Sequence, residues 1–203
     1  MRKNHAKQVS VKVMVLVLAV VMVLGCAVGG TIAWLTAKSA DVVNTFTVGN
    51  IAIELNESNN LDLKMIPGWT ITKDPKATVV AGSEDCYLFV KVAKSENFDT
   101  YMTYEIADGW TELTEAAGTG YKVYYRVFDS TNEDCPNVKG TAYSVLKNNQ
   151  VSVLSTVDMA TMNQAQNNKP TLTVTAYAIQ LMKNNDTPFE PAEAWAKIQN
   201  PNT

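Results

Sequence analysis

The stretch YKVYYRVF, residues 121–128, decides the fold of this chain. Its side chains alternate with the period of two that a β-strand imposes, so the two faces of the stretch differ in character. One face is apolar and aromatic and the other carries two charges, with Tyr121, Val123, Tyr125 and Val127 opposite Lys122 and Arg126. The pattern predicts a half-buried strand with its charged face in solvent.

Further strand-like stretches lie on both sides of this one. Residues 171–179 read TLTVTAYAI, and residues 87–92 are almost continuously apolar, which is typical of a strand covered on both faces. Pro75 interrupts residues 71–80 and favours two short edge strands over one central strand. Roughly seven or more short strands without alternating helices predict an all-β fold, an antiparallel β-sandwich. In residues 171–179 the inward side chains are Leu172, Val174, Ala176 and Ala178.

Two short helices are expected beside these strands. Ser155 and Asp158 resemble a capping box that opens a helix over residues 157–166. Pro191 fits the first position of a second helix, where its missing N–H costs nothing. One side of this second helix is lined by Ala194, Trp195 and Ile198.

The N-terminal residues have the organisation of a secretory signal. Four basic residues precede an apolar run at residues 13–28, which is short for a membrane-spanning helix of about 20 residues. Small residues at Thr31 and Ala33 fit the −3 and −1 positions of a cleavage site. We therefore predict a helical signal peptide at residues 1–33, cut after Ala33 so that Trp34 becomes the new N-terminus.

Two alternatives to this cleavage stay open. Residues 31–35 can extend the apolar run into a permanent N-terminal anchor. The sequence before Cys26 also looks like a lipobox, in which Cys26 is lipidated and retained. A lipidated Cys26 tethers the domain to the membrane, whereas cleavage after Ala33 sets it free.

Removal of the leader leaves residues 34–203 as one domain, long enough to bury a real core. The leader carries four of the 17 basic residues and none of the 20 acidic ones, so the mature chain has thirteen positive charges against twenty negative, a net charge of −7. An acidic surface argues against nucleic acid and anionic lipid as partners. We expect a secreted, extracellular protein that meets the membrane only through its leader.

Two cysteines remain after cleavage. In an exported chain Cys86 and Cys135 can pair, although Cys86 lies inside an apolar strand and fits equally well as a small buried hydrophobe. The residues alone leave both readings open.

No catalytic constellation is visible. The single histidine, His5, belongs to the leader, and zinc hydrolases, cysteine proteases and Ser-His-Asp enzymes all need an imidazole. We therefore expect no enzyme, no cofactor and no metal site. Residues 129–137 alternate oxygen side chains that could hold calcium, but they lack the glycine and the final glutamate of an EF-hand loop. Trp69 and Trp110 lie beside turns and could stack on sugars.

Three stretches of the chain resemble the TasA–camelysin family of exported Gram-positive proteins. The first is GGTIAWLTAKSADVVNTFTVGNIAIEL at residues 29–55, and the second is IPGWTITKDPKATVVAGSEDCYLFVKV at residues 66–92. The third joins TAYAIQ at residues 175–180 to AEAWAKI at residues 192–198. The resemblance covers nearly the whole mature chain, and it implies a jelly-roll sandwich released by a SipW-type signal peptidase.

For TasA, the resemblance also implies self-association into biofilm-matrix fibres, in which the freed N-terminal segment inserts as a strand into a neighbouring subunit. Here that donor strand falls on residues 34–48, with Val42, Val43, Phe46 and Val48 as candidate anchors. The expected function is a structural subunit of the cell surface or matrix. The alternatives are a monomeric exported adhesion or binding domain, a lipoprotein anchored at Cys26, and a camelysin-like metallopeptidase.

Overall fold

The computed structural model describes residues 50–58 and 64–200, which belong to one compact unit spanning Val48–Thr203. The fold is mostly β, and all of the strand pairs formed by the described residues are antiparallel. Three short α-helices accompany the strands, and the described sheets do not close into a barrel.

The largest sheet has four strands in the order β10-β4-β7-β6. Strand β4 lies at its centre, paired with β10 from Cys86 to Lys94 and with β7 along most of its length. Because neighbours cover both its edges and layers cover both its faces, the apolar run at residues 87–92 is buried almost throughout, as its composition predicts. The four strands are β10 (Leu172–Gln180), β4 (Cys86–Lys94), β7 (Tyr121–Phe128) and β6 (Thr111–Glu112).

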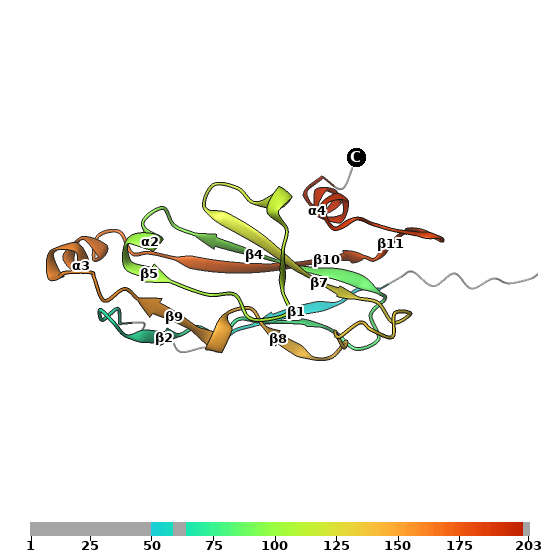
Figure 1. Cartoon of the computed structure of the whole chain (residues 1–203), viewed down its shortest axis with the longest axis horizontal. Helices are drawn as coiled ribbons and strands as arrows, with labels where there is room; N and C mark the ends of the chain where they lie inside the picture. Colours follow the sequence, from blue (N-terminus) through green and yellow to red (C-terminus); the bar gives the residue numbers. More distant parts are fainter. Residues whose placement is uncertain (1–49, 59–63, 201–203) are drawn as a thin grey trace, which may run out of the picture. The chain divides into compact units, whose positions relative to one another are not determined.

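Two three-stranded sheets form the layer that faces the long sheet (Figure 1). One has the order β1-β3-β8 and the other the order β2-β9-β5. Pro75 does separate two short strands, but only β2 is an edge, because β3 pairs with both β1 and β8. The strands are β1 (Ile53–Asn56), β3 (Lys76–Val79), β8 (Ala142–Ser144), β2 (Thr70–Thr72), β9 (Gln150–Val153) and β5 (Met102–Thr103).

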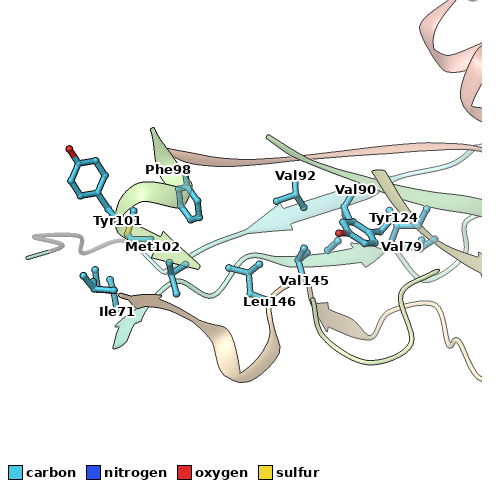
Figure 2. Close-up of a cluster of buried hydrophobic side chains, with 14 of the residues drawn as sticks. Ile71, Val79, Val90, Val92, Phe98, Tyr101, Met102, Tyr124, Val145 and Leu146 are labelled. Carbon is cyan, nitrogen blue, oxygen red and sulfur yellow. The ribbon is translucent and has the colours of Figure 1, made fainter. Parts of the chain in front are cut away.

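The main core lies between these two layers. Even-numbered side chains of β4, among them Val90 and Val92, point toward Val145 and Leu146 of the opposite layer, and all four are almost fully buried (Figure 2). From β10, the predicted inward residues Leu172, Val174 and Ala176 pack against this same core. The strand alternation read from the sequence therefore places these side chains on the correct face.

A second core covers the opposite face of the long sheet. Helix α4 (Pro191–Gln199) begins with Pro191 at its first turn and buries Ala194 and Trp195, while Ile198 packs beside them, as the sequence predicts. The Trp195 ring lies 5.4 Å from Phe89 and 5.3 Å from Tyr177, measured between ring centroids. The short strands β11 (Met182–Asn184) and β12 (Thr187–Pro188) form a hairpin just before this helix.

The prediction of a solvated face on β7 holds only for Lys122, because Tyr124, Arg126 and Phe128 of the same face are buried. Arg126, expected on a solvated face, is only 9% exposed. Its guanidinium donates from Nη1 to Asn137 Oδ1 at 2.8 Å and from Nη2 to the carbonyl of Asp108 at 2.6 Å. The rings of Trp110 and Tyr143 lie 4.9 and 4.4 Å from it, so that polar and aromatic partners replace water around the buried charge.

The helices also differ from expectation. There are three α-helices rather than two in the described residues: α2 (Phe98–Tyr101), α3 (Met159–Ala165) and α4. Helix α3 is shorter than predicted, and its cap is Asp158 alone, whose Oδ1 accepts from the backbone N–H of Thr161 at 2.8 Å. Asp158 thus takes the N-cap place given to Ser155. The described residues also form two short 3₁₀ turns, η1 (Thr114–Ala116) and η2 (Lys147–Asn149).

Candidate functional site

The residues predicted for export and assembly lie outside the described residues. They are the cleavage pair Ala33 and Trp34, the alternative lipidation site Cys26, and the donor-strand anchors Val42, Val43, Phe46 and Val48. Their roles stay predictions, and the described part of the chain can inform only the partner surface that such residues would need.

Both remaining cysteines are free thiols. Cys86 is fully buried, and burial raises the pKa of its thiol to about 11. A thiol with this pKa is protonated at neutral pH and is a poor nucleophile. Cys135 is half-buried, and its Sγ donates to the carbonyl of Val127 at 3.3 Å.

The acidic residues of the turns are used within the fold. Burial alone would raise the pKa of the Asp85 carboxyl, but hydrogen bonds from Lys139 and Ser130 outweigh it and lower that pKa. In the proposed calcium loop, Asp129 Oδ1 instead accepts from the backbone and hydroxyl of Thr131, at 2.9 and 2.7 Å. Within residues 50–58 and 64–200, no three His, Cys, Asp or Glu side chains gather to hold a metal ion.

The two tryptophans proposed for sugar stacking have different environments. Trp110 is half-buried, its indole N–H donates to the carbonyl of Ser144 at 2.8 Å, and one face of its ring meets Arg126. Trp69 is 62% exposed. A single exposed ring offers no pair of stacking surfaces, so these residues do not come together as a sugar site.

One edge of the long sheet is the first candidate interaction surface. Strand β10 runs without interruption from Leu172 to Gln180, and among the described strands its only pairing partner is β4. The side chains of Thr173 and Thr175 are exposed along it. Strand β1, the edge of the facing sheet, lies against β10 on this side. An edge strand of this length can accept another strand by main-chain pairing.

The second candidate is an apolar groove of about 930 Å³ beside α3. One wall comes from β2, β9 and β5, and the other from α3 and the first residues of β10. Its apolar lining includes Met65, Ile71, Phe98, Met102, Met162 and Leu172. At its rim Met159 is 74% exposed and Ile66 is 36% exposed.

The wall after α3 is fixed by hydrogen bonds to the end of β4. The N–H of Thr171 donates to Ser95 Oγ at 2.9 Å, and the N–H of Ser95 donates back to the Thr171 carbonyl at 3.0 Å. Asn97 Nδ2 donates to the carbonyl of Asn168 at 2.7 Å. These bonds hold the segment that follows the helix against the sheet, so the groove is built into the fold.

Sequence reasoning missed this groove. Four of its lining residues are methionines, Met65, Met102, Met159 and Met162, which lie far apart in the chain. The available signal was local: Met159 and Met162 are spaced by three residues on a predicted helix, which places them on one side of it. Nothing in the sequence says that the segments carrying the other two fold onto the same place.

The comparisons with known proteins add no assignment. No protein-family model, curated protein sequence or solved structure matches this chain. None of the helices in the described ranges is long and apolar enough to span a bilayer. The fold and site therefore define the chain only as an antiparallel, β-rich domain, with a sheet edge at β10 that no described strand covers and with an apolar groove.

Proposed function

We propose that this chain is a secreted, TasA–camelysin-like structural subunit that assembles into cell-surface or matrix fibres. In this proposal a SipW-type signal peptidase removes residues 1–33, and residues 34–48 of one copy add a strand to a jelly-roll-like sandwich of the next. The observation that carries the proposal is the β10 edge, nine residues long and paired only with β4 among the described strands.

The length of the donor suits this edge. Residues 34–48 span about 50 Å when extended at 3.3 Å per residue, while the nine residues of β10 need about 30 Å. The donor can therefore pair along all of β10 with residues to spare for a link to its own domain. Each backbone hydrogen bond gained contributes about 0.5–1.5 kcal/mol, so pairing along most of β10, together with burial of the donor's apolar face, is needed to offset the cost of association.

The side-chain pattern of the donor also suits β10. Val42, Phe46 and Val48 have the same parity, so in a strand they share one face. Beside β10, a register that directs this face inward continues the row formed by Leu172 and Val174, which pack against the main core. Between Val42 and Val48, Asn44 is the one polar residue on this face.

Electron microscopy of purified protein tests strand donation. A form beginning at Trp34 is expected to make filaments, and a form beginning at Gly49 is expected to stay monomeric. Phe46→Asp should abolish filaments because it places a charge on the apolar donor face. Thr47→Asp, which adds the same charge on the opposite face of the same strand, is the matched control and should assemble. Filaments from the shortened form would refute the proposal.

A monomeric exported binding domain is the second candidate, and the apolar groove beside α3 favours it. If the domain acts alone, it can also be a lipoprotein held through Cys26. N-terminal mass analysis of native protein separates these cases, because an acylated Cys26 means a tether and a free Trp34 means release. Neither candidate assigns an enzymatic activity, and chelator-sensitive casein cleavage by the pure protein would overturn both in favour of a peptidase.

A further inference from the structure

The groove beside α3 carries an inference that does not depend on fibre assembly. We propose that it binds a long-chain carboxylate, a single acyl chain with one anionic head group. The volume of about 930 Å³ lies in the upper part of the range of small-molecule sites, roughly 300–1,000 Å³. Its buried base is apolar, and its amide side chains and Lys169 lie on and just after α3, so that it offers both an apolar and a polar part, as such a ligand does.

The apolar part of the groove is suited to a flexible chain. Phe98, Met102, Val151 and Ala165 are buried at its base, and half-buried Met162 lies above them on α3. Methionine side chains are unbranched and polarisable, so they adapt to a chain without a fixed shape. A peptide in the same place would bring backbone N–H and C=O groups to a surface with few partners for them, and each unpaired group would weaken binding.

The charged side chains that line the groove favour an anionic ligand. Its described lining includes no Asp or Glu, and two lysines. Lys73 is already neutralised, because its Nζ lies 2.8 Å from a carboxylate oxygen of Glu57. Lys169 is exposed and has no acidic partner in the described part of the chain. Lys169 is therefore the cation available to a bound carboxylate.

Two amides lie beside this cation. Asn163 and Gln166 line the groove, are exposed, and hydrogen-bond to each other through Gln166 Nε2 and Asn163 Oδ1 at 3.4 Å. Because Asn163, Gln166 and Lys169 are exposed while the apolar base is buried, the polar groups mark the solvent end of the groove. A carboxylate there keeps contact with water, and its acyl chain runs inward. This arrangement avoids the cost of burying a charge.

Binding of saturated carboxylates and matched n-alcohols to the chain beginning at Trp34 tests the proposal. Displacement of a fluorescent fatty-acid analogue, below the micellar concentration of each ligand, gives the affinities. The dissociation constant should fall about fourfold for each added methylene until the groove is filled, because each buried CH₂ contributes a constant increment. At equal length the carboxylate should bind more tightly than the alcohol, and salt should reduce that difference.

Two pairs of variants locate the site. Lys169→Gln should weaken carboxylate binding about two- to fivefold and leave alcohol binding unchanged, whereas Lys183→Gln, at a lysine that pairs with Glu193 on the opposite side of the long sheet, should change neither. Met159→Asp places a negative charge on the rim at a highly exposed position and should abolish carboxylate binding. Met182→Asp is its control, an exposed methionine outside the groove.

Affinity that does not depend on chain length, or an equal loss for Lys183→Gln and Lys169→Gln, would overturn the proposal. Sedimentation of the same variants tests whether a second copy of the chain, rather than a ligand, occupies the groove. If Met159→Asp changes self-association and leaves ligand affinity unaltered, the groove is a contact between copies and the ligand proposal is wrong. The filament assay separates the two proposals, because Met159→Asp leaves both the donor strand and the outer edge of β10 intact and should still form filaments.

Discussion

Replacement of Trp195 by alanine is the sharpest test of the layer that covers the long sheet. The indole is 7% exposed and joins α4 to two strands of that sheet, with ring contacts to Phe89 on β4 and Tyr177 on β10. With nine residues, α4 is too short to be stable in isolation, so its helical structure depends on this packing. Trp195→Ala should therefore both lower stability and release the helix.

The magnitude follows from the burial. Truncation of a buried Trp or Phe to Ala costs about 3–5 kcal/mol, which includes the lost aromatic contacts and the cavity that remains. For a domain of this size each kcal/mol lowers Tm by about 2–4 °C, so a drop of roughly 6–20 °C is expected. The matched control is Trp69→Ala, which removes the same side chain at a 62% exposed position and should change stability by less than about 0.5 kcal/mol.

Urea unfolding and calorimetry measure the two variants, and limited proteolysis reports on the helix. Trp195→Ala should expose a cleavage site near the C-terminus before global unfolding, because the undocked helix opens locally. Equal Tm values for the two variants, or unchanged protease resistance after Trp195→Ala, would show that α4 does not stabilise the sheet and would refute the reasoning.

Two further predictions concern buried and half-buried charges. Arg126→Lys keeps a charge but cannot reach both hydrogen-bond acceptors or stack between two rings, so it should cost about 2 kcal/mol in urea unfolding. Lys122→Gln, at the one exposed residue of the same strand, should cost less than about 1 kcal/mol. Hydrogen bonds from Lys139 and Ser130 lower the pKa of the Asp85 carboxyl in the folded state. The ionised carboxyl therefore stabilises the fold fully above its unfolded pKa near 3.8, and this contribution is lost as pH falls through its folded pKa. The unfolding free energy of the wild type should thus drop more steeply than that of Asp85→Asn as pH falls below 3.8, by no more than about 1 kcal/mol down to pH 3, and parallel curves would contradict the assignment.

The elements that sequence reasoning placed correctly are those specified by their own residues. The apolar run at 87–92 is a fully covered strand, and Pro191 opens a helix whose apolar side packs inward. In both cases side-chain periodicity or a single residue's backbone geometry is sufficient, because neither feature depends on which distant segment supplies the cover.

Arg126 shows where local pattern fails. In sequence it is a charge on an alternating strand, and solvent is the ordinary place for it. Its burial depends on Asp108 and Asn137, which precede and follow the strand in loops, and on the rings of Trp110 and Tyr143. No periodicity within residues 121–128 reports on those partners.

The sequence by itself determined the β character of the domain and the position of its central strand and of its last helix, and it predicts the export signal that motivates the proposed function. The tertiary structure alone decided that both faces of the long sheet are covered, that β10 is an edge among the described strands, and that four methionines from three stretches of the chain share one groove. The reason is physical. Periodicity records which side of a segment avoids water, whereas edges and grooves are set by contacts between segments far apart in the chain.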